Sequence, residues 1–352
     1  MITVTKPYLP ERAKLDKYID RIYDTCRLTN DGPLVRELTR RLEEYLGVKH
    51  LLLVANGTLA LQIAYRALGI TGTALTTPFS FVATSSTLIW EGITPKYVDI
   101  DPETFNMDPG LVERSITDDT TAIIPVHVFG NPCEVERIDE IAKKNDLKVI
   151  YDAAHTFGVR YKGESILNHG DAATLSFHAT KTYHTIEGGA IAFKEKEALD
   201  RARLLINFGI TGPDKIEGLG INAKMNEFQA AMGLAVLDSI DHIVEKRSQV
   251  WRYYHERLKD SFQLQKWNPH ATNNYGYFPV LFKDEEALLR CQKRLNERDI
   301  YPRRYFYPSL DSVEYIRGER MEVSRDIAGK VLCLPVYAEI TKPTMNQVIR
   351  NI

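Results

Sequence analysis

The sequence has few cysteines and no long apolar run, and both absences narrow the kinds of protein that it can encode. Four cysteines occur in 352 residues, far apart and without a Cys-x-x-Cys pair: Cys26, Cys133, Cys291 and Cys333. We therefore expect no zinc site, and a chain of this length needs no disulfide framework. The prediction is that these thiols are reduced and mostly buried.

No apolar run is long enough to cross a bilayer, and the first residues lack the basic-then-apolar pattern of a secretory signal. The 45 basic and 47 acidic residues give a net charge of −2 and form no long block of like charge. Such a balance provides no patch for nucleic acid or lipid. We therefore expect a cytoplasmic protein with no nucleic-acid partner and no membrane partner.

Short apolar runs alternate with helical segments between about residues 50 and 195, which is typical of an α/β sheet covered on both faces. The hydrophobic content of 44% is enough for a large core. Seven candidate strands are apolar or β-branched and short: 51–54, 74–77, 96–100, 122–128, 148–151, 172–177 and 190–193.

The pattern changes after residue 225, where residues 227–246 predict one long helix that continues through Leu258. Beyond it we expect an α+β region with two strands and a helix between them: 277–282, 331–335 and 285–298. A boundary near residue 240 would divide the chain into a large α/β domain that includes the N-terminal segment, 1–240, and a small C-terminal α+β domain, 241–352.

Lys181 lies in the run Ser-Phe-His-Ala-Thr-Lys-Thr-Tyr-His-Thr-Ile-Glu-Gly-Gly, which begins at the end of a predicted strand. An amine must lose its proton before it adds to an aldehyde, so reactive lysines lie in partly desolvated pockets. The run is typical of the lysine segment of a pyridoxal-phosphate enzyme, although most single lysines are simply solvated. His178 and His184 flank Lys181, but no third ligand has suitable spacing, so we expect no metal site.

Asn56-Gly57-Thr58 follows the first predicted strand and opens a helix over 59–68. Backbone N–H groups and the Thr58 hydroxyl at a helix N-terminus form a natural phosphate cradle. The alternative is an ordinary strand-to-helix turn in which Thr58 caps the helix.

Asp152 follows the predicted strand 148–151, where an open parallel sheet places its functional residues. A buried carboxylate there needs a cationic partner. The protonated pyridine nitrogen of the cofactor would be that partner, because an ionised Asp152 keeps the nitrogen protonated and the ring electron-withdrawing. The alternative is an aspartate that caps the following helix.

These segments together resemble the sugar aminotransferases of the DegT/DnrJ/EryC1/StrS family, and the resemblance extends over nearly the whole chain. It implies a pyridoxal-phosphate-dependent transferase of fold type I, similar to aspartate aminotransferase, with a seven-stranded, mostly parallel sheet and a smaller C-terminal α+β domain. Pyridoxal 5'-phosphate is the implied cofactor, with pyridoxamine phosphate as its amino form during the reaction.

The resemblance also implies roles for single residues. Lys181 would link to the cofactor covalently and shuttle the proton. Five further residues match family positions that contact the cofactor. Gly57, Thr58 and Ser176 match positions that hold the phosphate, His155 matches the one that contacts the phenolic oxygen, and Phe81 matches the aromatic residue that stacks on the ring. Asn222 matches an asparagine that reaches the phosphate across a dimer interface, which implies a homodimer with shared active sites.

Arg303, Tyr305 and Tyr307 resemble the segment that lines the sugar site, with a solvated loop as the alternative. The implied reaction is transamination of a nucleotide-linked 4-keto-6-deoxy sugar at C4 with glutamate as donor. We expect dTDP-4-keto-6-deoxyglucose as substrate and a product used in surface polysaccharides such as the O-antigen of lipopolysaccharide. Alternatives are a 3-aminotransferase, an enzyme for UDP- or GDP-sugars, or a non-catalytic ligand-binding regulator. Lys181 argues against the related sugar dehydratases, which have histidine there.

Overall fold

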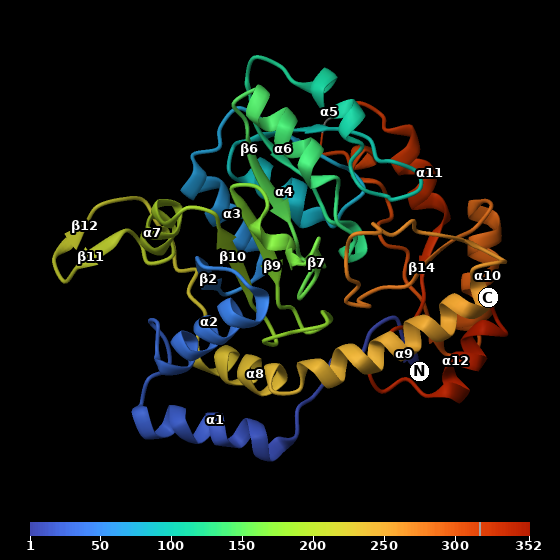
Figure 1. Ribbon diagram of the computed structural model, residues 1–352, viewed down its shortest axis with the longest axis horizontal. Helices are drawn as coiled ribbons and strands as arrows, with labels where there is room; N and C mark the ends of the chain where they lie inside the picture. Colours follow the sequence, from blue (N-terminus) through green and yellow to red (C-terminus); the bar gives the residue numbers. More distant parts are fainter. Residues whose placement is uncertain (317) are drawn as a thin grey trace.

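The structure, a computed structural model, describes residues 1–316 and 318–352 (Figure 1). Its centre is a mixed sheet of seven strands, in which β10 runs antiparallel to both of its neighbours and the other strands are parallel. Across the sheet the order is β2 (Leu51–Val54), β10 (Gly189–Phe193), β9 (Ala172–Ser176), β6 (Lys148–Asp152), β5 (Thr120–Ile124), β3 (Thr73–Thr76) and β4 (Thr94–Tyr97). The predicted seven-stranded, mostly parallel sheet is confirmed.

Four predicted strands end later in the sequence pattern than in the structure, two of them by a single residue. The run 122–128 ends as a strand at Ile124, and the run 96–100 ends at Tyr97. Val126, Val128 and Ile100 remain buried although none of them lies in a strand of the sheet. Hydrophobicity reports burial rather than hydrogen bonding, so it places these strand ends too late.

Helices cover both faces of the sheet, and alternate residues of β2 face opposite apolar clusters. One face is covered by α3 (Gly57–Leu68), α4 (Val82–Trp90) and α7 (Lys196–Leu205). The other is covered by α2 (Pro33–Leu46), α5 (Pro109–Ser115), α6 (Val135–Lys144) and α8 (Glu227–Leu237), with α1 (Arg12–Thr25) packed outside α8.

A third apolar cluster belongs to the C-terminal region, where β13, β14 and β16 form a small antiparallel sheet (Figure 1). Its elements are α9 (Ile240–Leu258), β13 (Gln263–Leu264), β14 (Pro279–Leu281), α10 (Glu285–Asn296), β15 (Ile300–Tyr301), α11 (Glu322–Lys330), β16 (Val331–Cys333) and α12 (Lys342–Ile349). The N-terminal strand β1 (Ile2–Thr3) pairs with β15, so the first residues join this region. A domain boundary near residue 240 stays a prediction.

The single long helix predicted from residue 227 onward is wrong, because the structure has two helices, α8 and α9, with a break at Asp238 and Ser239. Ser239 has φ −120° and ψ 8°, outside the helical range. The Asp238 carboxylate accepts hydrogen bonds from Tyr18 at 2.9 Å and Arg41 at 2.7 Å. The apolar pattern continues through the break, so periodicity alone does not reveal it.

Smaller elements complete the chain. A hairpin of β11 (Ile210–Gly212) and β12 (Lys215–Ile216) projects from the body (Figure 1), and β7 (Arg160–Tyr161) pairs with β8 (Glu164–Ser165). All four cysteines are free and three are buried, as predicted, with Cys26 exposed. None of the helices in the described ranges combines the length and apolarity that a bilayer crossing needs.

Candidate active site

A cavity of about 470 Å³ lies where β6 and β9 end, the edge at which open parallel sheets bind ligands. Nine of the residues singled out in the sequence line it: Gly57, Thr58, Phe81, Asp152, His155, Ser176, Lys181, Arg303 and Tyr305. They come from the ends of β6 and β9 and the turns that follow, from the starts of α3 and α4, and from the C-terminal region. The fold therefore brings together segments that are up to 248 residues apart, from Gly57 to Tyr305.

The start of α3 forms one wall of the cavity. Asn56 caps this helix, and its Oδ1 accepts the Leu59 N–H at 2.9 Å. A Cβ atom added at Gly57 would lie 2.9 Å from the Cβ of Ser176, and one at Gly189 would lie 2.6 Å from the Asn56 carbonyl. Glycine is therefore required for this close packing, which leaves the Gly57 and Thr58 N–H groups beside Ser176 without a partner among the described residues. Such a turn suits an anion.

Asp152, the last residue of β6, is buried on the cavity wall. Its carboxylate accepts a hydrogen bond from the Thr84 hydroxyl at 2.7 Å and from the Ala154 N–H at 3.1 Å. Burial raises the pKa of Asp152, although these hydrogen bonds and the charge of Lys181 oppose the shift. Within the described ranges no cation forms an ion pair with it, so the site is suited to a positively charged ligand atom.

Lys181 lies in the turn that leaves β9, and its backbone N–H donates to the His178 carbonyl at 2.9 Å. The Nζ atom donates to the Tyr277 hydroxyl at 3.2 Å. Burial lowers the pKa of Lys181 to about 8, although the Asp152 charge raises it. About one tenth of the amine is therefore neutral and nucleophilic at pH 7, far more than for a solvated lysine.

His155 lies in a layer of aromatic rings. Its Nδ1 accepts the Phe129 N–H at 3.2 Å, so the neutral ring carries its proton on Nε2. Burial lowers the pKa of His155 and favours that neutral form. The ring lies 4.4 Å from that of Tyr277 and is stacked 5.8 Å from that of Phe306. Phe81, which is 55% exposed, precedes α4 at the cavity.

Arg303 and Tyr305 reach the cavity from the C-terminal region, and the Arg303 guanidinium lies 4.9 Å from the centre of the Tyr305 ring. Tyr307 does not line the cavity. Its ring lies against the Arg304 guanidinium at 3.4 Å, and the side chain is exposed.

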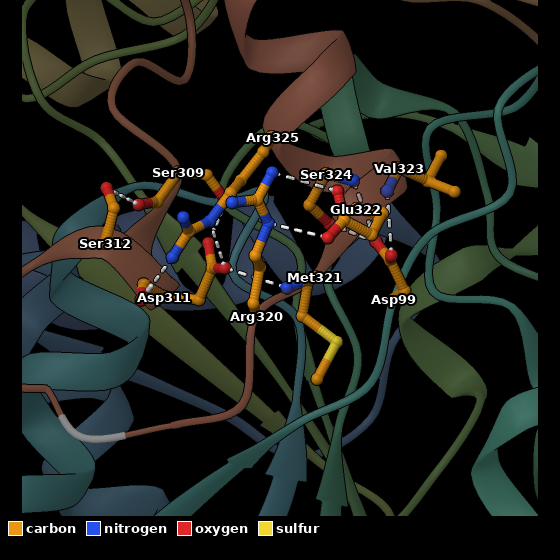
Figure 2. Close-up of polar contacts among 10 residues, drawn as sticks. All are labelled: Asp99, Ser309, Asp311, Ser312, Arg320, Met321, Glu322, Val323, Ser324 and Arg325. Carbon is orange, nitrogen blue, oxygen red and sulfur yellow. Dashed lines mark hydrogen bonds and ion pairs between the residues drawn. The ribbon is translucent and has the colours of Figure 1, made fainter.

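Two carboxylates fix the chain beyond Tyr305: Asp99 ties it to the end of β4, and Asp311 joins two parts of the segment itself (Figure 2). Asp99, which follows β4, accepts the N–H groups of Val323 and Ser324 at the start of α11, at 2.9 and 2.8 Å. The fully buried Asp311 side chain accepts the Met321 N–H at 2.8 Å and the Arg325 Nε at 2.6 Å.

Asn222 is exposed and lies outside the cavity, beside Asn207, near the base of the projecting hairpin. His178 lines the cavity, whereas His184 links two segments: its Nε2 lies 2.7 Å from the Tyr8 carbonyl and its Nδ1 accepts the Ile186 N–H. Across the described residues, no cluster of three His, Cys, Asp or Glu side chains is arranged for a metal ion.

Sequence reasoning did not single out Thr84, Tyr277 or Phe306, which also belong to this site. Thr84 lies three residues after Phe81, at the start of a helix that faces the sheet, and this position could have indicated that Thr84 belongs to the site. Tyr277 is 96 residues from Lys181, and it lies within a predicted strand that suggested only core packing.

The family model of the DegT/DnrJ/EryC1/StrS aminotransferase family matches residues 11–352. The chain belongs to this family. The seven-stranded sheet, the small C-terminal region and the lysine turn are therefore those of a family aminotransferase, an enzyme class that uses pyridoxal phosphate.

Individual members of the family are similar to this chain along almost its whole length. The chain is 42% identical to the dTDP-4-amino-4,6-dideoxy-D-glucose transaminase of Shigella dysenteriae, covering 100% of this chain and 98% of that one. It is 40% identical to the Escherichia coli enzyme of the same name, covering 97% and 95%. The crystal structure of DesI in the presence of its TDP-sugar product matches with a TM-score of 0.93 and 33% identity, over 99% and 91% of the two chains.

Proposed function

We propose that this family aminotransferase transfers the amino group of glutamate to C4 of dTDP-4-keto-6-deoxyglucose, forming dTDP-4-amino-4,6-dideoxy-D-glucose. The observation that carries the proposal is the full-length identity of 42% to a transaminase named for this product. DesI, at 33% identity, was crystallised with a TDP-sugar product, which supports the nucleotide. The surface polysaccharide that would use the product is part of the same proposal.

The cavity has the features that pyridoxal phosphate requires. The turn at Gly57 and Thr58, with Ser176 beside it, would hold the phosphate, and Asp152 would hold the pyridine nitrogen. His155, with its proton on Nε2, can donate to the phenolic oxygen. Phe81 would cover the ring. When bound, the cofactor supplies the electron sink that stabilises negative charge at the α-carbon of the donor.

The chain's own residues would carry out the proton transfers. The neutral Lys181 Nζ would accept the proton that leaves the α-carbon of glutamate and would deliver it to the cofactor carbon that carries the amino group, so the proton count of Lys181 returns to its starting value. Asp152 stays ionised and keeps its cationic partner protonated throughout. Arg303 would offer its guanidinium, and Tyr305 its hydroxyl, to the nucleotide-linked sugar. The second half-reaction reverses these transfers on the keto sugar.

We assign the working unit to a homodimer in which Asn222 reaches the partner's site. Exposed apolar side chains surround its segment and the hairpin: Phe208, Ile210, Ile216, Leu219, Ile221 and Phe228. Such a group of apolar residues is typical of a protein interface. Asn222 lies at the base of this surface and outside the cavity of its own chain, which agrees with a contact to a second copy.

The test is incubation of the purified protein with glutamate and a panel of keto sugars linked to dTDP, UDP or GDP, followed by mass and NMR identification of the product. We expect a 4-amino product from the dTDP sugar and none from Lys181→Ala. An amino group at C3, or a preference for a UDP or GDP sugar, would replace the proposed substrate with an alternative from the same family. A protein that binds the ligands without turnover would favour a regulator.

A further inference from the structure

Tyr277 contacts three groups of the site at once. Its hydroxyl accepts the hydrogen bond from Lys181 Nζ at 3.2 Å. Its ring centre lies 4.4 Å from that of His155 and 5.7 Å from that of Tyr305.

Helix α9 fixes the backbone on which Tyr277 stands. The Trp251 indole N–H donates to the Tyr277 carbonyl at 3.1 Å. Arg247, which is only 3% exposed, donates to the carbonyls of Tyr275 at 3.2 Å and Gly276 at 2.9 Å. Within the described chain, Arg247 has no carboxylate partner, so backbone carbonyls satisfy this buried cation. Tyr277 is therefore held rigidly by the C-terminal region while it touches the lysine of the large sheet.

In this structure the Lys181 amine that Tyr277 contacts is not bound covalently to a cofactor, so Nζ can donate a hydrogen bond. Under the proposed function, Lys181 is in that state whenever the amino donor has displaced it, which is when it carries the migrating proton. An amine that has just accepted a proton gains a strong acceptor in the Tyr277 hydroxyl, because hydrogen bonds from a charged donor are stronger than neutral ones. Burial raises the pKa of Tyr277, so the hydroxyl stays protonated and does not compete for the proton.

We propose that Tyr277 is a catalytic residue that holds the uncombined Lys181 amine and aims it at the α-carbon during proton transfer. Arg247 and Trp251 are positioning residues that act through Tyr277. This role rests on the proposed transamination and adds to it a hydroxyl from the C-terminal region that acts on the reacting nitrogen.

The first test uses cofactor-free protein. Competitive acetylation over a range of pH, with peptide mass spectrometry, reports the protonation of Lys181 itself. Removing the acceptor in Tyr277→Phe should lower the labelling midpoint of Lys181 by about one pH unit. The matched control is Tyr254→Phe on α9, because the Tyr254 hydroxyl is buried without a hydrogen-bond partner in the described structure and its ring packs on Phe278 at 5.3 Å. This control should leave the midpoint unchanged.

The second test uses the loaded enzyme in single-turnover reactions with glutamate and α-deuterated glutamate. Tyr277→Phe should react about tenfold more slowly, with a larger isotope effect and nearly unchanged glutamate affinity, since proton transfer becomes slower. If wild-type protein fails to convert glutamate, the proposed function fails and the role of Tyr277 falls with it. If wild-type protein reacts and Tyr277→Phe matches it in rate, isotope effect and labelling midpoint, the inference alone is overturned.

Discussion

The Thr84 hydroxyl donates a hydrogen bond to Oδ2 of Asp152 at 2.7 Å, joining the start of α4 to the end of β6. A second donor, the Ala154 N–H, occupies Oδ1 at 3.1 Å. These neutral donors orient the buried carboxylate and favour its ionised form, but they add no charge to balance it. Asp152 is thus oriented for a cation that a ligand would bring.

Replacing Asp152 with Asn should slow the reaction although it does not destabilise the fold. The loss of one charged hydrogen bond of about 3 kcal/mol should slow the glutamate half-reaction by roughly 100-fold or more. Stopped-flow absorbance in single turnovers measures this rate. Unchanged rates in Asp152→Asn would contradict the assignment of Asp152 to the pyridine nitrogen.

The same variant should be more stable than wild type when no cofactor is bound. Because burial raises the pKa of Asp152, its stability contribution is largest below the ordinary carboxyl pKa and is lost as pH rises through the folded value. At pH 7 the ionised group therefore opposes folding. Asp152→Asn removes this penalty and should stabilise the cofactor-free protein by about 1 kcal/mol, measurable as a higher Tm. A lower Tm at pH 7 would argue against an uncompensated carboxylate.

The pKa of about 8 at Lys181 predicts how cofactor capture depends on pH. The neutral amine is the reactive form, so the capture rate should rise about tenfold per pH unit below pH 8 and level off above it. The change in cofactor absorbance after mixing with cofactor-free protein measures this rate. Asp152→Asn should move the midpoint lower, because the Asp152 charge raises the lysine pKa. A midpoint near 10 in wild type would mean that Lys181 is solvated.

The sequence predicted most of the sheet because its central strands are short apolar runs closed by turn residues, whereas the edge strand β4 is Thr-Pro-Lys-Tyr and was placed less well. Leu51–Val54 is correct to the residue, since Ala55-Asn56-Gly57 follows at once. The residues at the edge of the cavity could also be predicted from the sequence, because Asp152 and Ser176 each end a strand of a mostly parallel sheet.

Contacts between residues that are far apart in the chain could not be predicted from the sequence. The Tyr277 hydroxyl meets Lys181 only because α9 holds the Tyr275–Tyr277 backbone, and no local period encodes that arrangement. At the break beside Ser239, the neighbouring Asp238 is likewise bound by Tyr18 and Arg41 from distant parts of the chain. Tertiary hydrogen bonds of this kind override local preference without leaving a pattern in the chain.

Asp311→Asn should loosen the segment that carries Arg303 and Tyr305. The variant removes the ion pair between the buried Asp311 carboxylate and the partly exposed Arg325, and should destabilise the protein by about 2 kcal/mol. We expect a higher KM for the keto sugar, with a smaller change in the glutamate half-reaction, whose lysine and carboxylate lie on the large sheet. Urea unfolding and steady-state kinetics measure the two effects.

The matched control for Asp311→Asn lies on α11. Asp326 pairs with Lys330 four residues later, and its side chain is 55% exposed. Asp326→Asn should therefore change stability by less than about 0.5 kcal/mol and leave KM unchanged. If the two variants changed the KM for the keto sugar equally, the buried Asp311 carboxylate would not be what positions Arg303 and Tyr305.

Subunit mixing tests whether Asn222 completes the site of a second copy. Lys181→Ala lacks the reactive amine, and Asn222→Asp would set a carboxylate against the cofactor phosphate, so each parent should be inactive. In a heterodimer, one of the two sites would receive both an intact Lys181 and an intact Asn222. Because random exchange makes half of the dimers mixed, the recovered activity should be about one quarter of wild type. Native mass spectrometry would verify the exchange, and no recovered activity after it would mean that each site is built from one chain. The replacement must be acidic, because losing one neutral contact costs only about 1 kcal/mol and would leave the parent active.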